Sequence, residues 1–480
     1  MSIPKKVQLF FDSTWREGTS TQTLHDKFDG APLAEVHVPD RDQVDRAVRA
    51  VAEGQAAVRW TGYERGLVLM AASALMRERR AVFVDTVVAD TGFTLTDAER
   101  EIDRAIETLQ LCGEEAKRIT GRTVPLGGSP GGGGRIGFTL RKPLGVICAI
   151  TPFNAPVNTV CHKIGPALAA GNGVVLKPAP ETPLTATLLV ELLLDAGVPA
   201  ELLGLLPGGA QVGQALLEHP VPAFYAFTGS TRVGEHIARS VGIRRTQLEL
   251  GSLASTIVCA DAALDEAAGL CVNAAFRKAG QVCTSVQRLY VERTVMAEFG
   301  RLVAERLAGR PVGDPRCSGT FIGPVISAAS ADRIQSWVTE AVAQGAELVH
   351  GGERNGSVIA PTILGNVSRT MTVMTNEIFG PVVVLRPFDD LEEAVAEADD
   401  TAFGLAAGVF TADLDRALLV AQRMRVGTVH INETSSSRVD LMPFGGVKAS
   451  GSGLEGPRYA IEEMGEETLV TVGPTRPWQG

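Results

Sequence analysis

The chain has 480 residues, of which 45% are hydrophobic and 21% charged, and its formal net charge is −10. These values exclude a disordered tail, a collagen-like fibre and a small disulfide-stapled protein, and they predict roughly two to four globular units. No basic tract accompanies the acidic balance, so we expect neither nucleic acid nor an anionic membrane surface as a partner, because both require clustered Lys and Arg.

Other features of the sequence indicate where the protein works. The longest uncharged stretch, 143–161, is interrupted by prolines and asparagines, so no membrane-spanning helix is expected. The start of the chain lacks the apolar core of an export signal, and the seven cysteines are scattered without a CxxC pair. We therefore expect a cytoplasmic protein without a disulfide framework and without a metal site.

Two amphipathic helices are predicted first, at 41–60 and 63–78. From residue 145 onward, short apolar runs alternate with helical stretches. The runs are 145–150, 173–176, 203–206, 223–228 and 247–250, and the helices are 157–170, 185–196 and 210–217. Buried runs that alternate with helices indicate βαβ units around a parallel sheet. We therefore predict a doubly wound α/β domain.

The same alternation restarts after Leu253. Helices are predicted at 262–275, 294–307 and 329–344, with a strand at 288–291. A restart of this kind indicates a second α/β domain, with the break near Gly251.

The segment 121–142 has a different character. Two strand-like pieces, 122–126 and 135–140, flank a glycine-rich tip that lacks a following Lys-Ser/Thr and opens no helix. This pattern favours a protruding hairpin over a phosphate-binding loop. Because isolated hairpins are marginally stable, we expect it to pair with the run 468–472 of a neighbouring subunit.

Two short segments carry residues suited to chemistry. Residues 229–234 follow a predicted strand and precede a helix, so their small side chains could let backbone amides face a pyrophosphate. An ordinary tight turn with Ser230 or Thr231 as helix cap explains the same residues. Cys283 lies among small and polar residues, which favour a reactive thiol, although most cysteines are buried and inert.

Seven motifs make the chain recognisable. They are Thr151-Pro-Phe-Asn154, Lys177-Pro-Ala-Pro-Glu-Thr-Pro183, Gly229-Ser-Thr231 with Gly234, Glu249-Leu-Gly251, Gly280-Gln-Val-Cys283, Glu377-Ile-Phe-Gly-Pro381 and Pro443-Phe-Gly-Gly446. In kind and in order they resemble the NAD(P)-dependent aldehyde dehydrogenase superfamily, and the resemblance extends to Val472.

The resemblance implies three catalytic residues. Cys283 is then the nucleophile that forms a thiohemiacetal, Asn154 supplies the oxyanion-stabilising amide, and Glu249 is the general base that hydrolyses the thioester. Their unreactive alternatives are a buried thiol, a turn-forming Asn and a solvated carboxylate.

The resemblance also implies binding residues. For the cofactor, NAD or NADP, they are Thr151, Pro152, Phe153, Lys177, Pro180, Gly229, Ser230, Gly234, Leu250, Glu377 and Phe379. For the substrate they are Arg438, Arg104, His162, Thr284 and Phe444, with Arg438 as a candidate clamp for an anionic group and Ser435 or Ser436 beside it. The alternative for Arg438 is an exposed salt bridge with Asp440.

Two positions depart from the family pattern. Pro180 stands where NAD-specific members have a Glu, which leaves NADP admissible because no carboxylate there repels a 2′-phosphate. Glu181 is next to it, so the choice between NAD and NADP stays open. Ser252 replaces a usual Gly.

The implied organisation is an aldehyde-dehydrogenase-like α/β fold. It has a Rossmann-type cofactor-binding domain at 1–121 and 142–251, to which 450–466 returns, a catalytic domain at 252–449, and an oligomerisation element at 122–141 and 467–480. The implied function is oxidation of a small oxygenated or anionic aldehyde to the acid by a homodimer or homotetramer. The alternatives are a CoA-acylating dehydrogenase, which Glu249 disfavours, and a catalytically inactive binding or structural member.

Overall fold

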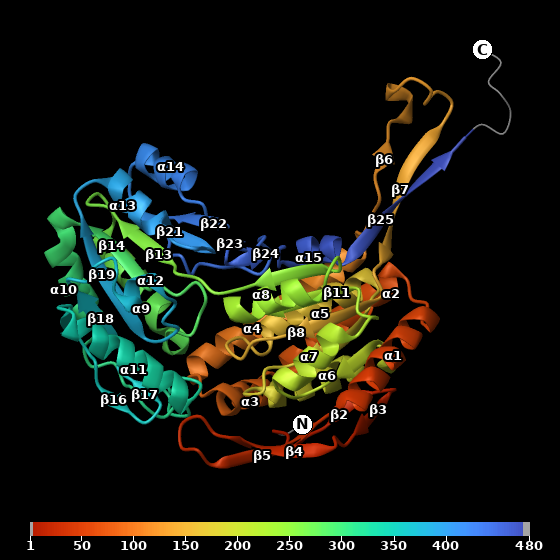
Figure 1. The fold of residues 1–480 in the computed structure, drawn as a ribbon, viewed down its shortest axis with the longest axis horizontal. Helices are drawn as coiled ribbons and strands as arrows, with labels where there is room; N and C mark the ends of the chain where they lie inside the picture. Colours follow the sequence, from red (N-terminus) through yellow and green to blue (C-terminus); the bar gives the residue numbers. More distant parts are fainter. Residues whose placement is uncertain (1–2, 474–480) are drawn as a thin grey trace.

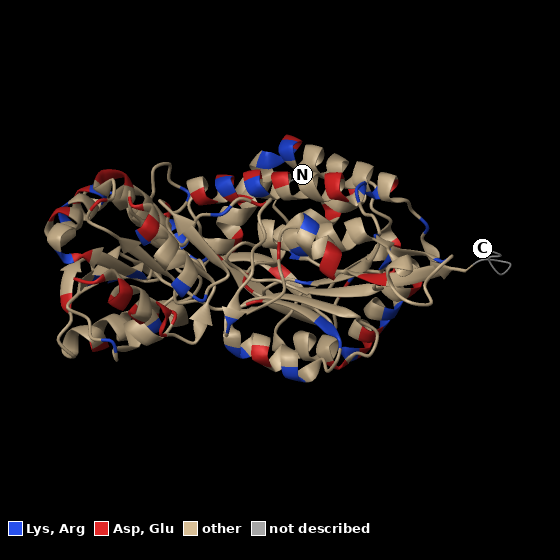
Figure 2. Cartoon of the chain, turned by 90° about the horizontal axis from the view of Figure 1, so that it is seen from above, with Lys and Arg blue, Asp and Glu red and all other residues tan. Residues whose placement is uncertain are grey.

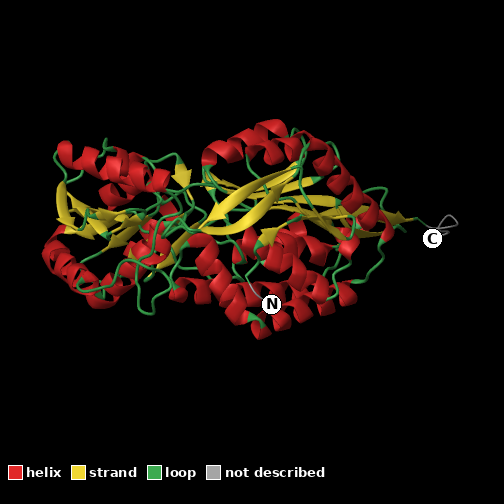
Figure 3. Ribbon diagram, turned by 90° about the horizontal axis from the view of Figure 1, so that it is seen from below, coloured by secondary structure: helices red, strands yellow, loops and turns green. Residues whose placement is uncertain are grey.

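The computed structural model describes residues 3–473, so the predictions for 1–2 and 474–480 lie outside the described residues. Two lobes lie side by side, and an arm projects from the lobe that contains the N-terminal helices (Figure 1). In each lobe a twisted sheet has helices on both faces (Figure 3). The predicted α/β fold is therefore confirmed.

The sheet of the larger lobe has eight strands among the described residues, and its five central strands run parallel. In spatial order they are β24 (Gly451–Ser452), β12 (Arg245–Glu249), β11 (Phe224–Thr228), β8 (Val146–Ile150), β9 (Gly173–Lys177), β10 (Leu203–Leu205), β2 (Leu9–Phe11) and β3 (Thr14–Arg16). The helices of this lobe are α1 (Arg41–Ala57), α2 (Gly62–Glu78), α3 (Arg80–Thr91), α4 (Leu95–Ala116), α5 (Asn158–Ala170), α6 (Pro183–Asp195), α7 (Ala210–Glu218), α8 (Thr231–Ser240) and α15 (Pro457–Glu463).

Alternate residues of the buried strands supply two separate cores. In β8, Ile147 and Ala149 pack on the side of α2 to α6, whereas Val146 and Cys148 pack on the side of α1, α7 and α8. This is the period of two that a strand imposes on its side chains. Both faces of the strand are apolar because helices cover both.

The smaller lobe has a seven-stranded sheet within the described part of the chain. In spatial order its strands are β15 (Glu347–His350), β18 (Thr362–Gly365), β19 (Val382–Phe388), β14 (Arg288–Glu292), β13 (Ser255–Val258), β21 (Ala406–Phe410) and β22 (Thr428–Ile431). Its helices are α9 (Leu264–Phe276), α10 (Met296–Leu307), α11 (Ala328–Ala343), α12 (Thr372–Thr375), α13 (Leu391–Asp399) and α14 (Leu414–Arg423).

Minor strands are β1 (Lys6–Val7), β4 (Ser20–His25), β5 (Pro32–Val38), β16 (Arg354–Asn355), β17 (Val358–Ile359), β20 (Phe403–Gly404) and β23 (Val447–Lys448).

The projecting arm is a three-stranded antiparallel sheet of β6 (Thr123–Val124), β7 (Ile136–Pro143) and β25 (Gly465–Val472). The expected hairpin is present, but its partner was predicted wrongly: β25 of the same chain pairs with β7 over eight residues. The chain returns beside β7 because α15 packs against α5, which places residue 465 at the base of the arm.

Acidic and basic residues are interspersed along the outer helices (Figure 2). Between residues 3 and 473, no helix combines the length and the apolar character needed to cross a bilayer. Within the same range, no group of three or more His, Cys, Asp and Glu side chains is arranged to hold a metal ion.

Candidate active site

A cleft of about 800 Å³ opens at the carboxyl ends of β8, β9 and β11. Nearly all of the predicted cofactor-binding residues line it: Thr151, Pro152, Phe153, Lys177, Pro180, Gly229, Ser230, Leu250, Glu377 and Phe379. Gly234 does not line the cleft. It lies under Leu250, whose Cδ2 would be 2.2 Å from an added Cβ, so this glycine permits close packing of α8 against the end of β12.

The cleft has the features that a dinucleotide requires. Ser230 caps α8 without a side-chain hydrogen bond, so the first N–H groups of this helix are left for an anion such as a pyrophosphate. The Lys177 ammonium lies at the end of β9, and burial lowers its pKa to about 8. Residues of β8, β9 and β11 therefore converge on a site that fits NAD or NADP, as in other doubly wound folds.

Cys283 lies at the inner end of this cleft and is half-buried. It also lines a small hollow together with Glu377 and Phe379. Burial, followed by the nearby Glu377 carboxylate, raises the pKa of Cys283 to about 12, and Arg438 opposes this rise. The thiol is therefore protonated at rest.

The backbone that leads to Cys283 makes a left-handed turn. Lys278, Ala279 and Gly280 have φ values of 53°, 54° and 69°. For a residue with a side chain this conformation costs about 1–2 kcal/mol. At Gly280 an added Cβ would lie 2.1 Å from the Gly380 carbonyl oxygen, so only glycine fits there.

Asn154 lies on the loop after β8 and lines the same cleft as Cys283. Its Nδ2 donates a hydrogen bond to the carbonyl oxygen of Gln281 at 2.9 Å, two residues before Cys283 in the chain. A side-chain amide has two hydrogens, so the second remains for an oxyanion.

Glu249 is the last residue of β12 and is only 3% exposed. Neither carboxylate oxygen has a hydrogen-bond partner within the described part of the chain. Burial, together with the neighbouring Glu455 carboxylate, raises the pKa of Glu249 well above its usual value, against the opposing effects of Lys163 and Arg438. The Glu249 carboxyl is therefore harder to ionise than a solvated one, and it is a stronger base once ionised.

A hydroxyl and guanidinium cluster includes Thr284, the residue that follows Cys283. Arg277 Nη2 donates to Ser436 Oγ at 2.7 Å, and Ser436 Oγ shares a hydrogen bond of 3.1 Å with Thr284 Oγ1. Burial lowers the pKa of Arg277, and Cys283 is among the groups whose charge acts on this guanidinium. The sequence analysis missed Arg277. Its position six residues before Cys283, in an otherwise small and apolar stretch, was the available signal.

The prediction that Arg438 has a free guanidinium for the substrate is wrong. Arg438 Nη2 pairs with Glu455 Oε2 at 2.9 Å, and the guanidinium carbon lies 3.8 Å from the centre of the Phe444 ring. Its predicted alternative partner, Asp440, binds other residues. Phe444 is buried and serves as the platform for Arg438.

Arg104 and His162 are both engaged with Asp440, so neither is free to bind a substrate as predicted. Arg104 donates twice to the Asp440 carboxylate, at 3.0 and 2.7 Å, and His162 Nε2 donates to Oδ1 at 2.7 Å. Asn158 Nδ2 adds a third donor at 3.0 Å. These contacts tie the loop that contains Ser436 and Arg438 to helices α4 and α5.

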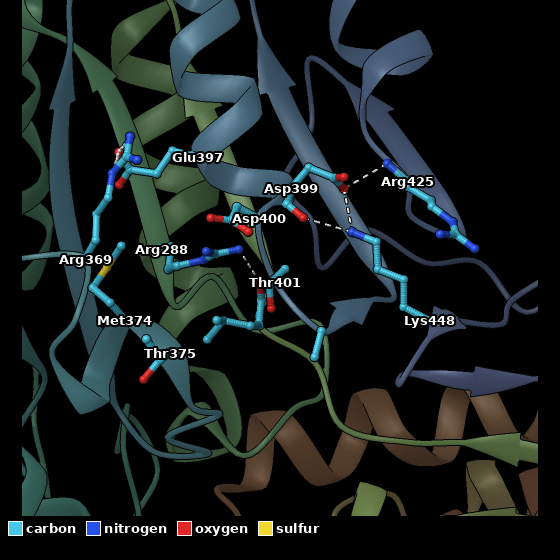
Figure 4. Close-up of a pocket in the computed structure, with 12 residues that line it drawn as sticks. Arg288, Arg369, Met374, Thr375, Glu397, Asp399, Asp400, Thr401, Arg425 and Lys448 are labelled. Carbon is cyan, nitrogen blue, oxygen red and sulfur yellow. Dashed lines mark hydrogen bonds and ion pairs between the residues drawn. The ribbon is translucent and has the colours of Figure 1, made fainter.

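A second cavity, of about 680 Å³, lies in the smaller lobe and shares no lining residue with the cleft (Figure 4). Four of its charged groups form ion pairs: Arg369 pairs with Glu397 at 2.7 Å, and Lys448 pairs with Asp399 at 2.9 Å. It contains no cysteine. The chemistry therefore belongs to the cleft at Cys283.

A dinucleotide cleft lined by a cysteine and a side-chain amide is typical of a nicotinamide-dependent dehydrogenase. Comparisons with known proteins agree. The family model for the aldehyde dehydrogenase family matches residues 15–470. The chain belongs to the aldehyde dehydrogenase family, and it is an oxidoreductase that uses NAD or NADP.

Three similar proteins illustrate the range of the family. The 3-sulfolactaldehyde dehydrogenase of Priestia aryabhattai is 44% identical over 469 residues, which cover 98% of both chains. Aldehyde dehydrogenase 21 of Physcomitrella patens, solved with its reaction product succinate, is 33% identical, with a TM-score of 0.95 and 99% of both chains covered. The NADP-dependent glyceraldehyde-3-phosphate dehydrogenase of Bacillus halodurans C-125, solved with NADP, is 32% identical, with a TM-score of 0.95 over 98% of this chain and 99% of that chain.

Proposed function

We propose that the protein oxidises a small aldehyde with a second, anionic group to the carboxylic acid, through covalent intermediates on Cys283. The observation that carries this proposal is that Cys283 lines the dinucleotide cleft and that the next residue, Thr284, belongs to the cluster of Arg277, Ser436 and Thr284. An aldehyde bound there presents its carbonyl to the sulfur and its anion to the guanidinium.

In the first step the Cys283 thiol loses its proton to solvent in the cleft, the resulting thiolate attacks the aldehyde carbon, and a thiohemiacetal forms. The carbonyl oxygen becomes negatively charged. The free hydrogen of the Asn154 amide, together with the backbone N–H of Cys283, stabilises this charge. Because Asn154 is bonded to Gln281, its amide does not need to reorient when the charge develops.

NAD or NADP held in the cleft would supply the hydride acceptor, and loss of a hydride from this carbon would leave a thioester on Cys283. Glu249 then takes a proton from a water molecule that attacks the thioester, and the acid is released. A carboxylate with no hydrogen-bond partner is available for this water, and the buried Glu455 beside it raises its basicity.

Glu249 also favours water over CoA as the acceptor of the acyl group. A CoA-acylating enzyme needs no general base for water. The proposal therefore expects that the rate of the reaction is unchanged when CoA is added.

The anionic substrate class has support from two directions. A buried guanidinium with hydroxyl partners recognises carboxylate, sulfonate and phosphate groups through charge-assisted hydrogen bonds. The names of the three similar proteins refer to a sulfonate, a dicarboxylate and a phosphate compound. We propose that the anion of the substrate binds Arg277.

The decisive experiment is a substrate panel with the purified protein. 3-Sulfolactaldehyde, succinic semialdehyde and glyceraldehyde 3-phosphate are compared with lactaldehyde and propionaldehyde, each with NAD and with NADP, and with or without CoA. We expect kcat/KM to be at least about tenfold higher for an anionic aldehyde, since one charged contact contributes about 1.5–3 kcal/mol. Activity retained by Cys283→Ala would refute the nucleophile, and an inactive wild type would favour a binding role.

We further propose a cytoplasmic homodimer or homotetramer. All seven cysteines are free, which suits a reducing compartment. The arm exposes Ile136 and Leu140 on one face and Leu469, 52% exposed, on the other, and such exposed apolar side chains are suited to contact with a second copy. Light scattering after size-exclusion chromatography, on wild type and Leu469→Glu, tests this assembly.

A further inference from the structure

The left-handed turn 278–280 is fastened to helix α4. The backbone N–H of Lys278 donates to Asp97 Oδ2 at 2.8 Å. The Lys278 carbonyl oxygen accepts hydrogen bonds from the backbone N–H and from the Nε2 of Gln281, both at 3.1 Å. A conformation that lysine and alanine rarely adopt is therefore maintained by the surrounding structure.

The side chain of Lys278 extends this connection to the other half of the reaction centre. Its Nζ lies 2.7 Å from Glu101 Oε2 and 2.7 Å from the carbonyl oxygen of Asn154. Both Lys278 and Glu101 are more than nine-tenths buried. The single ammonium thus joins α4 to the loop that contains the oxyanion-stabilising residue.

Glu101 holds that loop at a second point. Its Oε1 accepts hydrogen bonds from the backbone N–H groups of Asn158, at 2.8 Å, and Val157, at 3.2 Å. These N–H groups belong to the start of α5, which directly follows the Asn154 loop. The connection closes through Asn154, whose amide donates to the carbonyl of Gln281 on the Cys283 side.

We propose that Lys278, through its buried ion pair with Glu101, is a positioning residue that sets the Cys283 sulfur relative to the Asn154 amide. Lys278 does not contact the substrate, because its ammonium is occupied by Glu101 and the Asn154 carbonyl. It acts through the turn in front of Cys283 and through the Asn154 backbone. The inference rests on the proposed function, in which Cys283 and Asn154 act on the same carbonyl.

The test uses the full-length protein and the variants Lys278→Met, Lys278→Arg and the double variant Glu101→Gln/Lys278→Met. The double variant removes both charges of the buried pair, so neither is left unpaired. Its activity can therefore be measured even if Lys278→Met alone does not fold. Arg386→Met is the matched control, because Arg386 also pairs with a glutamate, Glu397 at 2.6 Å, but has no contact with the turn.

We expect kcat of the double variant to fall by about 10- to 100-fold, since a misplacement of about 1 Å can cost that much. KM for the aldehyde should change less than about threefold, because Arg277 and Ser436 are untouched. Arg386→Met should lower the melting temperature and leave kcat unchanged. A folded double variant with wild-type kcat would overturn the proposal. A fall in activity no larger than the fall in the amount of folded protein would also overturn it.

A second measurement needs neither aldehyde nor cofactor. The rate of Cys283 acylation by p-nitrophenyl acetate is followed in a Cys317→Ser background, because Cys317 is the other cysteine that is not buried. We expect this rate to fall with kcat in the double variant and to recover in part in Lys278→Arg. Unchanged acylation would refute the inference even if aldehyde oxidation fell. Conversely, slower acylation in a protein that oxidises no aldehyde would reject the proposed function alone.

Discussion

Arg438 Nη2 lies 2.9 Å from Oε2 of Glu455, and the two form an ion pair near Glu249, the proposed general base. Lys163 Nζ holds the other oxygen of Glu455 at 3.0 Å. Burial opposes ionisation of Glu455, but Lys163 and Arg438 outweigh it and hold the pKa of this carboxyl far below its usual range. A permanent negative charge therefore lies next to Glu249, and two cations moderate it.

Removal of Arg438 should change the pH dependence of the reaction and not its preference for anions. In Arg438→Met, Glu249 loses a neighbouring cation that lowers its pKa, so the pH at half-maximal kcat should rise. Anionic and neutral aldehydes should lose activity by similar factors. Arg438→Lys should restore the profile in part. If the pH–rate measurements showed a loss of activity confined to anionic aldehydes, Arg438 would instead be the residue that binds the anion.

Arg277→Ala should lose selectivity for anionic aldehydes. The guanidinium and Ser436 together offer charge-assisted hydrogen bonds, so kcat/KM for an anionic aldehyde should fall about 10- to 100-fold. The value for propionaldehyde should change less than about threefold. Ser436→Ala, which keeps the charge, is the milder companion variant. Equal losses for both substrates in steady-state kinetics would contradict the assignment.

Hydrolysis of the thioester should become faster as the pH rises. Glu249 has a raised pKa, so it is protonated below that pKa and becomes a base only as the pH approaches it. Rapid-quench measurements should show deacylation becoming faster as the pH rises above the ordinary carboxyl range. Glu249→Gln should release a single burst of reduced cofactor and then stop, with the acyl group on Cys283 visible by mass spectrometry. Sustained turnover of Glu249→Gln at the wild-type rate would exclude Glu249 as the base.

The preference for NADP should depend on Glu181 and on pH. Glu181 lines the cleft, and its charge acts on Lys177, so it repels a 2′-phosphate that the ammonium attracts. Glu181→Gln should raise kcat/KM for NADP relative to NAD by about tenfold, from one removed charge contact. Burial lowers the pKa of Lys177 to about 8, so this attraction should weaken as the pH rises from 7 to 9. A ratio that does not depend on pH would argue against Lys177 as the contact.

Asp440 should contribute to acid sensitivity. Burial opposes its ionisation, but the His162 hydrogen bond and Arg104 lower its pKa below the ordinary 3.8. A carboxyl with a lowered pKa stabilises the fold above about pH 4, and this contribution is lost as the pH falls towards the folded-state pKa. Thermal unfolding of Asp440→Asn should therefore depend less on pH below 4 than wild type, and at pH 7 it should be destabilised by about 3–5 kcal/mol. Parallel melting curves for the two proteins would contradict this.

The structure agrees with the sequence where local pattern was enough. The predicted strand 223–228 is β11, and the predicted helix 41–60 is α1, which ends three residues earlier. Helix α4 was not predicted, although it contributes Asp97, Glu101 and Arg104 to the region around the site. Its N-cap Thr94 and its amphipathic period were readable, but only the packing against α5 shows that its polar residues face inward.

By itself the sequence determined the parallel α/β architecture and the candidates Cys283, Asn154 and Glu249, because these depend on hydrophobic period and on short contiguous motifs. Only the tertiary structure decided which charges meet. Arg104 and Asp440 are 336 positions apart, and Lys278 and Glu101 are 177 apart. From the sequence, Arg438 was the leading candidate ligand for an anion and Arg104 a weaker one. Packing of α4 and α5 pairs Arg104 and Arg438 with protein carboxylates and leaves Arg277 beside Cys283. A buried charge must be paired, and only the tertiary structure determines which groups surround it.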